Sequence, residues 1–351
     1  MKFQAEYLPR INTVTLVIES DYQFEVSYLN QDCLEFHSSQ GQRKLIQLPH
    51  SIKYPPNYFP RKDGFVQVLR LRAFSSEHSE ICLDRSKNYT MSLATGKWMK
   101  SDLIRQPFEL CCGKCQALLV SSKNCKKIND MPSEYWAELM DYWHCHKPPV
   151  AEDGTSFYDR YSKLSPLVGE LLVGESFFLA SANWLNCCCK TSADLIRCMK
   201  CEGILGKLNK DGLFRIQKWS VLLRTHDKIE QFPAEYSIIS SIMNLLNSNG
   251  SRYFLLKGEG GIRVVLWIFA VGIRVTLSEY RPESDSIKVF YIKSLNSEDV
   301  KYDIGSQNFE ELTIDDAILK NFIEQLEEKN SQLPSPTQEM NSWKLSYLTC
   351  L

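Results

Sequence analysis

The sequences Cys112-Gly113-Lys114-Cys115 and Cys198-Met199-Lys200-Cys201 repeat one pattern, Cys-x-x-Cys, with 82 residues between them. A Cys-x-x-Cys turn brings two thiolates within reach of one tetrahedral Zn²⁺, and two such turns supply the four ligands of a closed structural site. We call residues 112–115 the first knuckle and residues 198–201 the second knuckle. Together they predict one structural Zn²⁺ that joins two distant β segments, with the ligands Cys112, Cys115, Cys198 and Cys201.

The sequence leaves alternatives for the ligand set. Cys111 could replace its neighbour Cys112, and the run Cys187-Cys188-Cys189 could supply a substitute ligand. The cysteines could also be reduced and buried without a metal, because free cysteine is among the most buried residue types. The chain has thirteen cysteines, and in an intracellular protein such a number favours metal sites or reactive thiols over disulfides.

Composition limits the classes of function. The chain has 351 residues, of which 44% are apolar and 24% charged, so it should fold into one or two domains. Its net charge of −1 and pI of about 6.6 give no basic field, so we expect no direct binding of nucleic acid. No apolar stretch is long enough to cross a membrane, and residues 1–10 carry no secretory leader, so we expect an intracellular protein.

The patterning predicts a mainly β fold with a few helices (α+β), built of antiparallel sandwich-like or barrel-like halves that the structural zinc pins together. Alternating apolar residues such as Val14, Leu16 and Ile18 indicate short strands over residues 1–120, and strands return from residue 167 onward. Helical spacing predicts helices near residues 133–143, 233–246 and 313–326. We expect three regions: an N-terminal β domain (1–110), a zinc-knuckle region (111–220) and a C-terminal α+β region (221–351).

The string Trp143-His144-Cys145-His146 directly follows the first of these helices. Three consecutive ligands cannot converge on one ion without unusual backbone geometry, so the string is a poor metal site by itself. One member could complete the structural zinc, or Cys145 could be a nucleophile activated by its imidazole neighbours. An exposed Cys145 could also bind the metal of a partner protein. The remaining alternative is a packed helix end.

The whole run Met-Pro-Ser-Glu-Tyr-Trp-Ala-Glu-Leu-Met-Asp-Tyr-Trp-His-Cys-His-Lys-Pro, residues 131–148, is distinctive. It resembles the signature of the HECT-like proteins that bind ubiquitin-conjugating enzymes, and the two knuckles agree with that family. The resemblance implies a ubiquitin-protein ligase with a HECT-like C-terminal region, located in the nucleus and cytoplasm.

The same resemblance implies a link to pre-mRNA 3′-end processing, through the metallo-β-lactamase-type endonuclease of the cleavage and polyadenylation machinery. On this interpretation the signature run enters the nuclease, and the thiolate of Cys145 meets its active-site zinc, which suits a soft sulfur ligand. The residues implied in partner binding are Trp136, Trp143, His144, Cys145 and His146.

One feature departs from the HECT ligases, because the local sequence around their ubiquitin-accepting cysteine is not found here. After Cys201 the chain has a single cysteine, Cys350, at the penultimate position. Two classes of function therefore stay open. The protein is either a binding protein for the endonuclease or a ligase that carries ubiquitin on a cysteine, with Cys145 as the candidate thiol.

Overall fold

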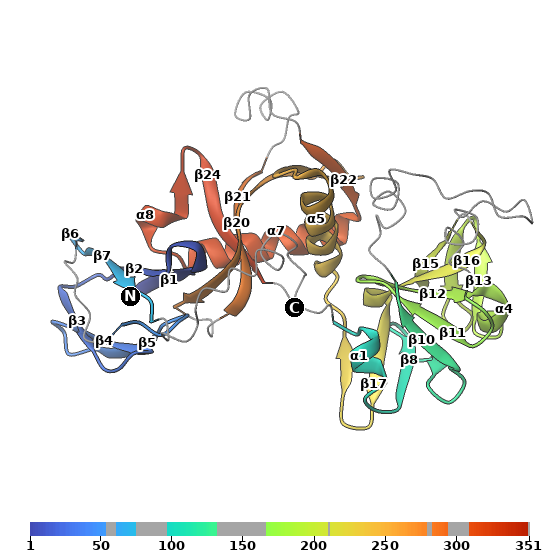
Figure 1. Cartoon of the computed structure of the whole chain (residues 1–351). Coiled ribbons are helices and arrows are strands. Elements are labelled where there is room, and N and C mark those ends of the chain that lie inside the picture. Colours follow the sequence, from blue (N-terminus) through green and yellow to red (C-terminus); the bar gives the residue numbers. More distant parts are fainter. Residues whose placement is uncertain are drawn as a thin grey trace, which may run out of the picture. The chain divides into compact units, whose positions relative to one another are not determined.

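The computed structural model describes residues 1–53, 61–74, 97–131, 166–209, 211–278, 283–293 and 309–349. The chain forms two compact units. Unit 1 comprises Met1–Ala94 and Leu245–Cys350, and unit 2 comprises Thr95–Asn244 (Figure 1). Of the signature run, only Met131 belongs to the described residues; its residues 132–148, with the predicted helix near residues 133–143, lie outside them.

Unit 1 is built on a ten-stranded sheet that combines strands from both ends of the chain. Its main path contains eight strands, in the order β23 (Glu339–Met340), β24 (Trp343–Thr349), β21 (Glu283–Lys293), β20 (Arg263–Leu277), β1 (Lys2–Leu8), β2 (Thr13–Glu19), β7 (Val66–Arg72) and β6 (Arg61–Asp63). Beside that path, β19 (Tyr253–Gly258) pairs with both β20 and β22 (Glu310–Ile314).

One core of unit 1 lies between this sheet and a three-stranded sheet. The smaller sheet contains β3 (Phe24–Tyr28), β4 (Cys33–Ser38) and β5 (Arg43–Gln47). Alternation along β2 buries Val14, Leu16 and Ile18 on one face, and they join Leu34 and Phe36 of β4 in one apolar cluster. The residues of the other parity on β2 and β7, such as Thr15 and Arg70, lie on the opposite face of the large sheet.

Three helical elements lie within the residues of unit 1 that the structure describes after Leu8 and outside α5 (Tyr236–Asn249). The 3₁₀ helix η1 (Pro9–Ile11) links β1 to β2, α7 (Asp316–Ser331) packs against β24 and β19, and α8 (Ser335–Gln338) follows it. The α7 helix begins after Asp315, whose carboxylate accepts hydrogen bonds from the backbone of Ala317 (2.9 Å) and Ile318 (3.4 Å).

Unit 2 contains two sheets that share one core. The four-stranded sheet has the order β18 (Ile229–Gln231), β17 (Val221–Thr225), β8 (Phe108–Cys112) and β9 (Leu118–Ser121). The seven-stranded sheet has the order β10 (Lys127–Asp130), β11 (Glu170–Val173), β12 (Phe177–Ser181), β16 (Leu213–Gln217), β15 (Ile204–Leu208), β14 (Leu195–Cys198) and β13 (Cys189–Ser192). The helical elements among the described residues are α1 (Lys100–Leu103), α4 (Ala182–Leu185), η2 (Lys218–Ser220) and α5 (Tyr236–Asn249), of which residues 245–249 are assigned to unit 1.

The expected mainly β class with a few helices and antiparallel sheets is confirmed. The helices predicted near residues 233–246 and 313–326 correspond to α5 and α7. The three regions expected from the sequence (1–110, 111–220 and 221–351) stay a prediction. Unit 1 depends on long-range pairing, because β1 pairs with β20 in the register Gln4↔Leu277 and so joins N-terminal and C-terminal parts of the chain in one sheet. In the part of the chain that the structure describes, no helix is long and apolar enough to span a bilayer.

Candidate metal centre

The two knuckles have the same backbone hydrogen bonds, residue for residue. The first follows β8: the amide of Cys112 donates to the carbonyl of Ala117 (2.8 Å), and the amide of Gln116 donates to the carbonyl of Cys112 (2.9 Å). The second follows β14: the amide of Cys198 donates to the carbonyl of Gly203, and the amide of Glu202 donates to the carbonyl of Cys198, both at 2.9 Å. Gln116 and Glu202 both have a left-handed backbone conformation, with φ of 58° and 59°. The sequence repeat is therefore also a repeat of local structure.

A glycine holds the first knuckle close to its neighbour. The amide of Gly113 donates to the carbonyl of Ser220 at 2.9 Å, and a Cβ atom on Gly113 would lie 2.8 Å from that same oxygen. Only glycine fits this approach without a shift of the backbone. The contact fixes the first knuckle against η2.

The four predicted cysteines bring their sulfur atoms together. The Sγ atoms of Cys112 and Cys201 lie 3.6 Å apart, those of Cys115 and Cys198 lie 3.7 Å apart, and all four lie within 4.8 Å of one another. A tetrahedron with metal–sulfur bonds of about 2.3 Å has sulfur–sulfur distances of about 3.8 Å. The donor set and its spacing therefore fit one tetrahedral, thiophilic ion such as Zn²⁺.

The acidities of these thiols differ. Burial raises the pKa of Cys112 to about 12, whereas a hydrogen bond from the Gly203 backbone is the main cause that lowers the pKa of Cys201 to about 7. A bound divalent cation would favour the thiolate form of all four residues, since metal ligands must be deprotonated.

The structure places the alternative ligands outside the cluster. Cys111 precedes Cys112 on β8, so its side chain points to the opposite face, and it does not join the four sulfur atoms. Cys188 and Cys189 lie with their Sγ atoms 3.8 Å apart, and Cys189 pairs across the sheet with Cys198, but neither belongs to the cluster of four. The sulfur cluster joins β8 of the four-stranded sheet to β14 of the seven-stranded sheet.

The signature run is attached to the same unit. The described chain leaves β10 at Asp130 and enters β11 at Glu170, and these two strands are parallel neighbours in the register Asp130↔Val173. The amide of Met131 still donates to Val173 at 2.8 Å. The predicted partner-binding residues lie outside the described residues: Trp136, Trp143, His144, Cys145 and His146.

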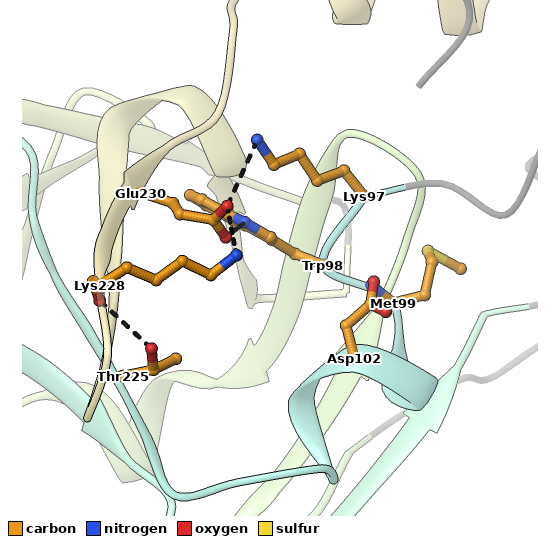
Figure 2. A network of polar contacts seen from close by, with 7 residues as sticks. All are labelled: Lys97, Trp98, Met99, Asp102, Thr225, Lys228 and Glu230. Carbon is orange, nitrogen blue, oxygen red and sulfur yellow. Dashed lines mark hydrogen bonds and ion pairs between the residues drawn. The ribbon is translucent and has the colours of Figure 1, made fainter. Parts of the chain in front are cut away.

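A polar network fixes the chain that precedes α1 (Figure 2). The indole of Trp98 donates to Glu230 at 3.2 Å, and Lys228 donates to the same carboxylate at 2.9 Å. Partial burial opposes the ionisation of Glu230, but the bond from Lys228 and the charge of Lys97 outweigh it and lower its pKa. Close to this network, the backbone amide of Lys100 donates to Asp130 (2.8 Å) at the end of β10, so the last described strand before the signature run is anchored to α1.

Sequence reasoning missed one residue of this region, Lys218. Its side chain is completely buried, and Nζ donates to the carbonyl of Lys97 at 2.8 Å. The ring centroids of Phe178 and Phe232 lie 5.4 and 5.5 Å from Nζ. Burial lowers the pKa of Lys218 to about 7. The negative charges of nearby carboxylates, Glu175 above all, raise this pKa but do not offset the effect of burial. The only signal in the sequence is a lysine that follows the apolar alternation of residues 213–217.

Comparison with known proteins identifies the family. A model of the family described as HECT-like Ubiquitin-conjugating enzyme (E2)-binding matches residues 6–345. The chain belongs to this family. The match confirms the resemblance carried by the signature run and places the protein in the ubiquitin pathway.

Curated relatives agree with the assignment. The uncharacterized protein YJR141W of Saccharomyces cerevisiae is 31% identical over 357 residues, and the alignment covers 100% of both chains. An E3 ubiquitin-protein ligase of Mus musculus is 24% identical over 266 residues, covering 68% of this chain and 70% of the relative. The ligase of the same name from Homo sapiens is 21% identical over 288 residues, covering 68% of this chain and 71% of the relative. No solved structure matches the chain.

Proposed function

We propose that the four-cysteine cluster binds one structural Zn²⁺ that holds unit 2 together. The proposal rests on sulfur spacings of 3.6 and 3.7 Å and on two knuckles of equal backbone geometry that belong to different sheets. Because Cys112 and Cys198 are buried, the loss of the ion would leave thiols in the core without the bonds that join the two sheets. Elemental analysis of the purified protein should give one zinc per chain, and a folded protein without metal would contradict the proposal.

We further propose that the protein binds the metallo-β-lactamase-type endonuclease of the pre-mRNA 3′-end processing machinery, in the nucleus and cytoplasm. In this proposal the signature run presents Cys145 to the active-site metal of the nuclease and so controls its activity or stability. A thiolate suits a zinc ion and would exclude the metal-bound water that the nuclease needs. Trp136, Trp143, His144 and His146 would shape the same contact.

The support for this proposal is the resemblance of the signature run, which lies entirely within the region that the family model matches. The fold adds a mechanical argument. The run is inserted between two adjacent strands of unit 2, and the preceding strand is tied down by the bond from Lys100 to Asp130. An ordered anchor favours binding, because less conformational entropy is lost when a partner binds a segment whose point of attachment is already fixed.

A pull-down of the endonuclease with wild-type protein and with Cys145→Ala tests the proposal. The variant should retain its fold and its zinc but lose most of the bound nuclease. Cys187→Ala is a matched control, because Cys187 is the one exposed cysteine among those that the structure describes. Equal capture by wild type and Cys145→Ala would contradict a role for this thiol.

The alternative function is a ubiquitin-protein ligase that binds a conjugating enzyme and carries ubiquitin on a cysteine. The names of the two mammalian relatives favour it. When a conjugating enzyme that carries ubiquitin is mixed with the protein, a ubiquitin adduct should then form on a cysteine of the protein, and reducing agents should remove it. The candidate carriers are Cys145, Cys187 and Cys350, and one Cys→Ala change should abolish the adduct while nuclease capture stays intact. An adduct that survives all three changes, or no adduct at all, would exclude this chemistry at these residues.

A further inference from the structure

A cleft of about 700 Å³ opens on unit 1, beside η1 and over β2 and β7. Figure 1 shows these strands next to each other near the N-terminus. The side chains that matter for its chemistry are Thr13, Thr15, Arg70 and Arg72, and the described residues that line it include no carboxylate. Its volume lies within the range of small-ligand sites.

The sheet register places two arginines and two threonines together. Thr15 pairs with Arg70, and Thr13 pairs with Arg72. Residues two apart on a strand share a face, and their Cα atoms lie about 7 Å apart. Both arginines are exposed, and neither forms an ion pair with any residue that the structure describes. Two neighbouring guanidinium groups without a counterion form a site that attracts a compact anion.

The nearest carboxylate by register is already neutralised. Glu6 of β1 lies opposite Thr15, but it forms an ion pair with Lys288 at 2.7 Å and accepts hydrogen bonds from Gln4 (3.1 Å) and from Tyr347. Its side chain is 8% exposed. Glu6 therefore contributes little to balancing the charge of the arginines.

The chemistry of the cleft selects among anions. Two guanidinium groups match the charge of a phosphate monoester, which is about −1.5 to −2 near neutral pH. The Thr13 hydroxyl already donates to the carbonyl of Ile11 (3.0 Å), so Thr15 is the better donor to a ligand. Ile11 is 65% exposed at the rim and offers an apolar contact to a residue beside the phosphate. Nucleic acid fits less well, because the described lining offers no aromatic side chain for base stacking and the whole chain carries a net charge of −1.

We propose that this cleft binds the phosphorylated serine or threonine of a partner peptide, with Arg70 and Arg72 holding the phosphate and Ile11 contacting a neighbouring apolar residue. Arginine forks bind phosphate oxygens in pairs, so the site would distinguish a phosphate from a single carboxylate. This inference goes beyond the proposed function and does not depend on zinc, ubiquitin or the endonuclease.

Fluorescence anisotropy with the full-length protein tests the inference. The probe is a labelled peptide with one phosphothreonine followed by leucine, compared with the same peptide unphosphorylated. Phosphorylation should tighten binding at least tenfold. Arg70→Gln and Arg72→Gln should each remove most of that gain, and Arg72→Lys should retain part of it. Arg43→Gln is the matched control, since Arg43 is an exposed arginine of β5 in the same unit.

Three results would overturn the inference. One is equal affinity for the phosphorylated and unphosphorylated peptides. Another is an equal loss of binding in Arg43→Gln, which would show only a general charge effect. The third is a single-stranded RNA of equal charge that binds as tightly as the phosphopeptide through the same arginines. Because both cleft arginines are exposed, thermal unfolding should be unchanged in every variant, and this separates a binding defect from a folding defect.

Discussion

The buried Lys218 should make the stability of unit 2 increase as the pH rises above 7. Burial lowers the pKa of Lys218 from an ordinary 10.5 to about 7 in the folded protein. Between these values the unfolded chain binds one more proton than the folded chain, so rising pH favours folding. The difference corresponds to about 5 kcal/mol in total, gained at no more than about 1.4 kcal/mol per pH unit. Below pH 7 Lys218 is protonated in both the folded and the unfolded chain, so the folded protein carries the full cost of burying its charge.

The assay is urea unfolding of zinc-loaded wild type and of Lys218→Met at pH 6 to 9.5. Methionine has a similar length and no charge, so the variant should lose this pH dependence. Between pH 7 and pH 9 the wild type should gain about 2–3 kcal/mol relative to Lys218→Met. Lys207→Met, at an exposed position of β15, should follow the wild type. Parallel curves for wild type and Lys218→Met would show that Lys218 titrates normally and would refute the argument.

Three further changes test the framework of the two units. Cys198→Ser should abolish zinc binding and lower the free energy of unfolding of unit 2 by more than about 4 kcal/mol, measured by elemental analysis and urea unfolding. Gly113→Ala should cost about 1–3 kcal/mol, because its Cβ would lie 2.8 Å from the carbonyl of Ser220, and an unchanged unfolding midpoint would contradict that close contact. Asp315→Ala should cost about 1 kcal/mol by removing the cap of α7, whereas Asp315→Ser should restore most of the loss in thermal unfolding.

The sequence was sufficient to predict the two knuckles, but it could not decide between neighbouring cysteines as metal ligands. The Cys-x-x-Cys spacing identified both knuckles, because that spacing fits one turn of backbone around an ion. It could not separate Cys111 from Cys112, since adjacent residues of the same type differ only in the face that they occupy. The strand β8, which pairs with β17, assigns each of them to a face.

Local sequence patterns could not predict how the chain divides into two units. Period-two alternation predicted strands such as β2, but it says nothing about which strand lies beside which. The pairing of Gln4 with Leu277 brings together residues that are far apart along the chain, and no periodic signal records it.

Two side-chain features also needed the tertiary structure. Lys218 was missed because charged residues are almost always exposed, and only the packed rings of Phe178 and Phe232 reveal the exception. The alternation of Arg70 and Arg72 was visible in the sequence, but the cleft beside them was not.

X-ray absorption at the zinc edge of the purified protein tests the central claim most directly, which is that four cysteines from two sheets hold one ion. The account expects one zinc per chain in a shell of four sulfur atoms at about 2.3 Å, with no nitrogen or oxygen ligand. Cys112→Ser and Cys201→Ser should each disturb that shell, whereas Cys111→Ser should leave it intact. A shell that contains imidazole nitrogen, or a folded protein that binds no zinc, would contradict the claim.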